Sequence, residues 1–202
     1  MLVNLLNPMI TGAASSSMTD EEAIEKYLSS QNVNYFNLLY KRYFRKVYGK
    51  CFSLLKSQAR AEDAAQEVFV KVLLNLSKFT GKSKFSTWLY SITYNYCIDV
   101  IRKKKKDLGV LVDDIGRYGE NIEDDDKADT EILETNVHRL KEVLNIIPAG
   151  DKAVLLMKYQ DDFSIKEICK VLTKSESAVK MKIKRAKEKF LRVYKETYAG
   201  VA

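Results

Sequence analysis

Residues 163–190 read FSIKEICKVLTKSESAVKMKIKRAKEKF, and this stretch decides the fold of the second half of the chain. Apolar residues recur at helical spacing over 164–172, a tight turn follows, and a second, longer helical pattern starts at Ser175. Ser164 and Ser175 are suitable N-cap residues for these two helices. The sequence therefore predicts a helix-turn-helix whose second helix runs to about Tyr194.

The second helix of this motif has one buried and one polar face. Val179, Ile183 and Ala186 continue an apolar stripe, while residues 174–195 hold nine Lys/Arg and only two acids. That imbalance is too large for a surface of ion pairs and favours DNA as the partner. In a helix-turn-helix the start of the second helix enters the major groove. The candidates for contact with DNA bases there are Ser175, Glu176, Ser177, Lys180, Met181, Lys184 and Arg185. Lys182 and Lys189 lie off that face and are expected to contact phosphate or nothing.

The first half of the chain is also helical in pattern. Apolar residues recur every three or four positions over 35–56, 61–76 and 85–106. The segment 78–84 contains Gly81 and is expected to be a loop. Thr19 to Glu22 forms a capping-box sequence that would open an earlier helix. No alternating strand pattern competes. The predicted fold is therefore all-α, with an N-terminal helical bundle and a C-terminal helix-turn-helix domain.

The domain boundaries follow from where the periodicity stops. We expect a disordered N-terminus over 1–18 (or a translation start at Met18), a helical domain over 19–106, and a second helical domain over 132–198. Residues 107–131 carry glycines and a run of acids and are expected to be a flexible acidic linker.

Charge alternates along the chain in the same blocks. Residues 1–34 carry a net charge of −3, 35–106 of +12, 107–136 of −9 and 137–202 of +7. Two basic domains on an acidic tether indicate a protein that contacts a polyanion at two places. No apolar run is long enough for a membrane span, and no small-molecule site is evident. The three dispersed cysteines suggest neither disulfides nor a metal site, so we expect a cytoplasmic protein without cofactors.

The basic block of the first domain interleaves cations with aromatic residues, a combination that suits unstacked bases of single-stranded DNA. Phe85 and Tyr96 fall on the apolar seam with Leu89 and Ile92, so we interpret them as structural. The candidates for nucleic-acid contact are Lys82, Lys84, Trp88, Tyr90, Tyr94, Asn95, Arg102 and Lys103. Tyr90 and Tyr94 are expected to point away from the seam.

One acidic patch interrupts this basic block. Asp63, Gln66 and Glu67 lie in the sequence AEDAAQEVF. Asp63 would be favourable in a first helical turn in any case, whereas Gln66 and Glu67 are past the easiest helix-capping positions. Acidic residues on a basic domain are better suited to a basic protein surface than to DNA. We therefore expect this patch to dock a protein.

At this point the residues resemble a known family. The stretch AEDAAQEVFVKVLLNLSKF, followed by KFSTWLYSITYNYCIDVIRKKKK, is similar to region two of bacterial extracytoplasmic-function (ECF) sigma factors. The segment from LNIIPAGDKAVLLMKYQDDFSIKEICKVL to SESAVKMKIKRAKEKF looks like their region four. The two matches cover most of the chain and occur in the family's order, with a linker between them.

The resemblance implies a sigma subunit that binds core RNA polymerase and directs promoter recognition and melting. It assigns Asp63, Gln66 and Glu67 to polymerase binding, residues 79–88 with Asn95 and Arg102 to the minus-ten element, and 175–185 to the minus-35 element. It adds an anti-sigma factor as a partner that the family commonly uses. No enzyme activity is expected, because melting needs only binding energy. The alternative is a conventional helix-turn-helix repressor or activator that binds duplex DNA without being a polymerase subunit.

Overall fold

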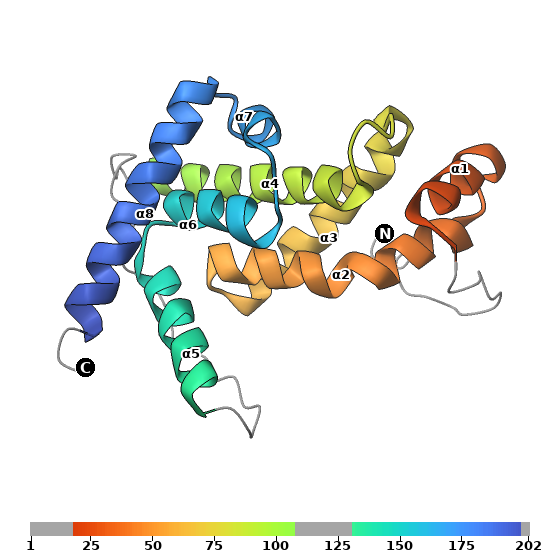
Figure 1. Cartoon of the computed structure of the whole chain (residues 1–202). Coiled ribbons are helices and arrows are strands. Elements are labelled where there is room, and N and C mark those ends of the chain that lie inside the picture. Colours follow the sequence, from red (N-terminus) through yellow and green to blue (C-terminus); the bar gives the residue numbers. More distant parts are fainter. Residues whose placement is uncertain (1–17, 108–130, 199–202) are drawn as a thin grey trace.

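The structure, a computed structural model, describes residues 18–107 and 131–198, without the side chains of 105–107 and 131–136. Within these ranges every regular element is helical, as predicted (Figure 1). The elements are α1 (Asp20–Ser30), α2 (Val33–Leu55), α3 (Gln58–Asn75), the 3-10 turn η2 (Leu76–Lys78), α4 (Phe85–Asp107), α5 (Glu131–Ile146), α6 (Ala149–Leu155), the π-type turn η3 (Leu156–Gln160), α7 (Ile165–Leu172) and α8 (Glu176–Tyr198).

Helices α2, α3 and α4 pack on one another to form the core of the N-terminal domain. Leu39 and Val47 from α2, Phe69 from α3 and Leu89 from α4 have no exposed surface. The N-cap Asn32 accepts a hydrogen bond from the Asn34 amide at the start of α2. The three long helices expected from the periodicity are thus present, with ends shifted by at most three residues.

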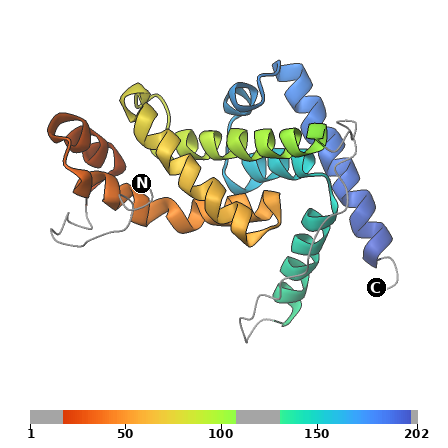
Figure 2. The ribbon, with the colours of Figure 1, turned by 180° about the vertical axis from the view of Figure 1, so that it is seen from behind.

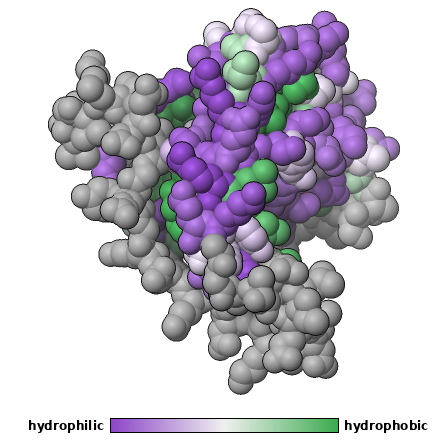
Figure 3. All heavy atoms as spheres, turned by 60° about the vertical axis from the view of Figure 1, so that its left-hand side comes forward, coloured by the Kyte–Doolittle hydropathy of each residue, from purple (hydrophilic) through white to green (hydrophobic). Residues whose placement is uncertain are grey.

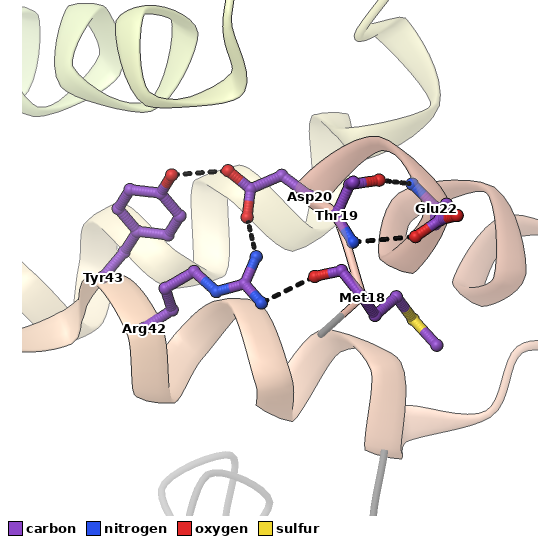
Figure 4. A network of polar contacts seen from close by, with 6 residues as sticks. All are labelled: Met18, Thr19, Asp20, Glu22, Arg42 and Tyr43. Carbon is purple, nitrogen blue, oxygen red and sulfur yellow. Dashed lines mark hydrogen bonds and ion pairs between the residues drawn. The ribbon is translucent and has the colours of Figure 1, made fainter. Parts of the chain in front are cut away.

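Helix α1 begins at the predicted capping box and is fastened to α2 by its first residue (Figure 4). The Thr19 hydroxyl accepts from the Glu22 amide, while the Glu22 carboxylate accepts from the Thr19 amide at 2.8 Å. The Asp20 carboxylate accepts a hydrogen bond from the Tyr43 hydroxyl at 2.5 Å and pairs with the Arg42 guanidinium. Arg42 also donates to the Met18 carbonyl, so α1 is held by side chains as well as by apolar packing.

The C-terminal domain consists of α5 to α8, in which α8 packs against α5, α6 and α7. Pro148 is the N-cap of α6. After η3 the chain turns sharply at Asp162, whose φ is 54°, and α7 then starts with a capping box between Ser164 and Glu167. The predicted helix-turn-helix is therefore present as α7 and α8.

Helix α4 is buried on two sides, where the sequence indicated only one. Phe85 and Leu89 lie in the core as expected, but Tyr96 is only half-buried. Tyr90 and Tyr94 were expected to point away from the seam and to contact nucleic acid, but Tyr90 is only 9% exposed and Tyr94 has no exposed surface. Tyr94 is covered because α6 and α7 of the C-terminal domain pack along α4, an arrangement visible in Figures 1 and 2, whereas Tyr90 lies against Tyr43 and Lys50 of α2.

Two expectations lie outside the described residues. These are the disordered N-terminus up to residue 17 and the acidic linker over 108–130. No helix within 18–107 and 131–198 is both long and apolar enough to cross a membrane.

Candidate nucleic-acid interface

A groove of about 640 Å³ runs between α3 and α4 on the surface of the N-terminal domain. From α4 it is lined by Trp88, Asn95, Tyr96, Arg102 and Lys103, most of which the sequence had singled out. Lys71 and Asn75 of α3 and Lys78 of η2 line its other side. The groove therefore combines cations, amide groups and aromatic faces, which are the groups that bind phosphates, base edges and unstacked bases.

Lys71, Asn75 and Lys78 were not among the sequence-predicted candidates. Lys71 and Asn75 lie one turn apart on α3, and Lys78 ends the 3-10 turn η2 that follows it. The Lys71 ammonium group lies 5.8 Å from the centre of the Tyr96 ring across the groove. The sequence shows these polar residues, but only the folded domain shows that they face α4.

An aromatic cluster closes one end of this groove. The Trp88 ring lies 5.5 Å from the Phe79 ring and 5.9 Å from the Phe85 ring, centre to centre. Phe85 is buried, whereas Phe79 and Trp88 remain half-exposed. The intervening loop turns at Gly81, whose φ of 69° suits glycine, and it presents Lys82 and Lys84 to solvent.

Asn95, Arg102 and Lys103 are exposed on the groove side of α4. Arg102 is 3.4 Å from the Asp99 carboxylate, an exposed pair that orients the guanidinium without adding much stability. Tyr90 and Tyr94 are on the opposite side of α4 and do not line the groove. The structure thus brings four of the eight predicted N-terminal residues together in the groove, leaves Lys82 and Lys84 on the adjoining loop, and separates the two tyrosines from them.

The acidic patch occupies an exposed face of α3. Asp63 and Glu67 are exposed, and Gln66 is half-buried beside them. Burial raises the pKa of Tyr96, and the charges of Glu67 and Asp63 contribute to that shift, so the patch lies within electrostatic range of the groove. Leu74, which is 72% exposed, continues the same stripe two turns further along α3. Leu74 was not predicted as part of this face, although a large apolar residue on a polar helix face can be recognised in the sequence.

In the C-terminal domain, α8 presents its first three turns to solvent. All seven predicted contact residues are exposed there: Ser175, Glu176, Ser177, Lys180, Met181, Lys184 and Arg185. The Ser175 hydroxyl accepts from the Ala178 amide at 3.4 Å and marks the start of the helix. Figure 3 shows that the side of the molecule that carries α8 is predominantly hydrophilic, with apolar side chains in small patches only. This surface is suited to a DNA groove.

Two of the lysines expected to contact phosphate or nothing have an internal partner instead. Lys182 and Lys189 lie 3.2 and 3.0 Å from the two carboxylate oxygens of Asp151 on α6. Both lysines are half-buried in this arrangement. They fasten α8 to α6 and thereby fix the direction in which the exposed face of α8 points.

No cluster of three or more metal-ligating side chains occurs among residues 18–104 and 137–198. The features of the described sites are hydrogen-bonding groups, cations and aromatic rings. A helical domain with a basic, aromatic groove, joined to a helix-turn-helix domain, defines a DNA-binding protein of the transcription machinery.

Comparisons with known proteins identify the family. Residues 39–107 match the family model for sigma-70 region 2, and residues 138–190 match that for sigma-70 region 4. The ECF RNA polymerase sigma factor SigW of Bacillus subtilis is 34% identical over 152 residues, which cover 72% of this chain and 81% of SigW. SigX of the same organism is 30% identical over 147 residues, covering 72% and 76%. The chain belongs to the ECF family of RNA polymerase sigma factors.

Solved structures agree at the level of the fold. The sigma factor RpoE of Bartonella quintana, solved with the anti-sigma factor NepR, has a TM-score of 0.57 at 18% identity, with 79% of this chain and 96% of that chain covered. CnrH, solved with the cytosolic domain of CnrY, also has a TM-score of 0.57, at 20% identity and with 86% and 96% covered. The chain is thus a sigma factor that directs promoter recognition and transcription initiation. As a class, sigma factors are not enzymes.

Proposed function

We propose that this sigma factor works through three separate surfaces, each assigned here to its own residues. The acidic face of α3, with Asp63, Gln66 and Glu67, docks on core RNA polymerase. The groove between α3 and α4, together with the loop that bears Lys82 and Lys84, binds the minus-ten element. The exposed start of α8 reads the minus-35 element. The observation that supports this division most is that an exposed acidic face lies beside a cation-lined aromatic groove on one small domain.

The docking face has the composition expected for a protein partner. Asp63 and Glu67 are one turn apart and exposed, and Leu74 adds an exposed apolar side chain on the same stripe. Such a stripe suits a helix that offers cations beside apolar residues. Its position next to the groove means that a docked polymerase would border the DNA bound there.

The free energy of binding unpaired bases in the groove drives promoter melting. Trp88 and Tyr96 supply aromatic faces, and stacking on an unpaired base contributes about 1–3 kcal/mol. Asn95 and Asn75 can bond base edges, while Lys71, Arg102 and Lys103 neutralise phosphates. Bases that leave the duplex are thereby captured without any bond being made or broken, so we propose that the chain has no catalytic activity and needs no cofactor.

Three further assignments belong to the same proposal. We assign residues 19–106 to the polymerase and minus-ten domain and 132–198 to the minus-35 domain. We place the protein in the cytoplasm, where promoter DNA and polymerase are. Since the structural relatives were solved with anti-sigma partners, we also propose that an anti-sigma factor binds this chain and regulates it.

A transcription experiment tests the proposal. Purified chain is added to core polymerase with a library of promoter fragments, and run-off transcripts are sequenced. We expect transcripts from a defined set of minus-35 and minus-ten sequences, and little binding of duplex DNA by the free chain. Tight binding of the free chain to duplex promoter DNA, without any promoter-specific transcript, would favour the repressor or activator instead.

A further inference from the structure

Helix α8 carries lysines on both flanks of its DNA-facing side, whose middle lies near Met181. A helix advances about 100° per residue. Lys180 and Lys187 therefore lie about 100° and 120° around the helix from Met181 in one direction. Lys182 and Lys189 lie about 100° and 80° around it in the other direction. The flanks of a helix in the major groove face the phosphate backbones, so all four lysines are suited by position to phosphate contact.

The two flanks differ in what holds their ammonium groups. On one flank, the Lys180 side chain is 65% exposed and pairs only with Glu176 of the same helix, at 3.8 Å. On the other flank, Lys182 and Lys189 both reach one carboxylate of α6, that of Asp151, at 3.2 and 3.0 Å. These two lysine side chains are 30% and 36% exposed, and the aspartate side chain is only 16% exposed. One flank of α8 is thus open to solvent, and the other is bound to α6.

The pairing with Asp151 is tighter than the ion pairs within α8. The three pairs within the helix join side chains that are 52–69% exposed at distances of 3.8–3.9 Å, and such pairs contribute little. Asp151 is mostly buried, so salt screens its contacts less, and it lies in the first turn of α6, where the helix dipole favours a negative charge. The Lys182 ammonium group lies against this turn, 3.7 Å from the point where a side chain at Gly150 would begin. Both lysines are therefore held toward α6.

Cations that are held in this way add nothing to the affinity for the DNA backbone. A phosphate contact is the same for every sequence, so it strengthens binding to all DNA without discriminating between bases. Each such contact also adds about 0.9 to the slope of log affinity against log salt. A chain that withholds Lys182 and Lys189 from phosphate binds bulk DNA more weakly, while the base contacts of α8 are unaffected.

We propose that Asp151 is a positioning residue that holds Lys182 and Lys189 away from the DNA backbone and so limits the affinity of α8 for DNA of any sequence. This inference rests on the proposed function, because it requires that the exposed start of α8 meets DNA. Promoter binding then depends on base contacts and on polymerase more than on attraction to phosphate. A free chain with this arrangement stays available to polymerase instead of being retained on bulk DNA.

Binding of the free, full-length chain to a labelled duplex of random sequence tests the proposal. Fluorescence anisotropy gives the affinity at several salt concentrations. Asp151→Asn keeps the shape of the side chain and removes the charge that holds the two lysines. We expect its affinity to rise about tenfold at low salt and its salt slope to steepen by about 1.8, the value for two more phosphate contacts. Asp151→Glu keeps the carboxylate, so its slope should stay close to that of the parent chain.

Two further variants separate the lysines from net charge and from folding. Asp162 is exposed in the same domain, and its φ of 54° is tolerated by asparagine, so Asp162→Asn is a matched loss of one charge that should leave the slope unchanged. Lys182→Gln/Lys189→Gln in the parent chain tests the proposal even if Asp151→Asn does not fold. Its slope should equal the parent slope, because the two lysines do not contact phosphate while Asp151 holds them.

The outcomes distinguish this inference from the proposed function. A purely structural ion pair predicts that Asp151→Asn binds DNA with the parent slope or more weakly, and that result would overturn the inference. A slope reduced by about 1.8 in Lys182→Gln/Lys189→Gln would also overturn it, since both lysines would then contact phosphate already. Lys180→Gln/Lys184→Gln removes two exposed cations from the open side of α8 and should lower the slope. An unchanged slope in that variant would contradict the proposed function of α8 itself.

Discussion

The ammonium group of Lys152 donates a hydrogen bond to the backbone carbonyl of Ser53, 2.8 Å away in the other domain. Burial, together with a smaller contribution from the charge of Lys56, lowers the pKa of this lysine to about 8. A cation that is buried without a carboxylate partner is easier to deprotonate in the folded protein than in the unfolded chain, where its pKa is near 10.5.

Stability should therefore rise with pH above neutrality. Between pH 8 and 10.5 the unfolded chain holds a proton on Lys152 that the folded chain has released, so the free energy of unfolding increases with pH, by at most about 1.4 kcal/mol per unit. Burial raises the pKa of Tyr90 to about 12, which has the opposite effect above pH 10. Thermal unfolding followed by circular dichroism should show Tm rising from pH 7 to 9.5 and falling above pH 10. In Lys152→Met the rise should shrink, and an undiminished rise would contradict this account.

The polar contacts of Asp20 between α1 and α2 should contribute strongly to the free energy of unfolding. Asp20→Ala leaves the Tyr43 hydroxyl and the Arg42 guanidinium without their carboxylate, and the expected loss is about 2–3 kcal/mol. Urea unfolding measures this loss. Glu25→Ala removes an exposed acid from the same helix and should change stability by about 0.5 kcal/mol or less. Equal effects of the two substitutions would mean that Asp20 does not fasten α1.

Polymerase binding should depend on the charge of the α3 face. In Asp63→Lys/Glu67→Lys two exposed acids become cations, and we expect core polymerase affinity to fall by about 100-fold while the helical content is unchanged. Fluorescence anisotropy with labelled chain and core polymerase measures the affinity. The control Glu21→Lys/Glu25→Lys makes the same change in net charge on α1. If both double variants lose affinity equally, net charge and not the docking face is responsible.

The lysines that line the groove should increase the salt dependence of promoter binding. Each phosphate contact contributes roughly 0.7–0.9 to the slope of log affinity against log salt. Lys71→Ala/Lys103→Ala should therefore reduce the slope by about 1.4–1.8, measured on promoter complexes formed with core polymerase. Lys41→Ala, on an exposed part of α2 outside the groove, should leave the slope unchanged. A slope that is the same in all three proteins would exclude Lys71 and Lys103 from phosphate contact.

Base preference at the minus-35 element should depend on Met181. Met181 is 48% exposed on the side of α8 that we propose faces DNA, and an apolar side chain there can contact a thymine methyl group. Met181→Ala should relax the preference at one base pair by about 1–3 kcal/mol, as read from run-off transcription of a minus-35 library. Leu191 is 52% exposed on the same helix but three turns further on, so Leu191→Ala should leave the preference intact.

Local rules predicted the helix starts and several buried positions correctly. Thr19 and Ser164 both form capping boxes, and Val179, Ile183 and Ala186 are buried on α8 as their spacing required. These features depend on residues within a few turns of one another, so sequence order is sufficient to find them.

Long-range packing explains where the predictions stopped. Tyr94 looked like an exposed aromatic because nothing near it in sequence shows that Asp161 and Phe163, more than sixty residues away, cover it. Lys71 and Asn75 were not predicted as contact residues, because the groove that they line forms only where α3 meets α4 in the folded domain. The contact roles of the seven exposed α8 residues remain predictions.

The sharp turn at Asp162 has a consequence for how this sigma factor can diverge. The left-handed backbone at this residue follows the π-type turn η3 and adjoins Asp161, whose carboxylate lies 2.5 Å from the ammonium group of Lys50. Neither Asp161 nor Lys50 lies on the groove, on the acidic face of α3 or on the exposed start of α8. A β-branched residue at position 162 would strain the turn without altering any residue proposed to contact bases. The packing around Asp161 and the choice of promoter can therefore change through separate substitutions.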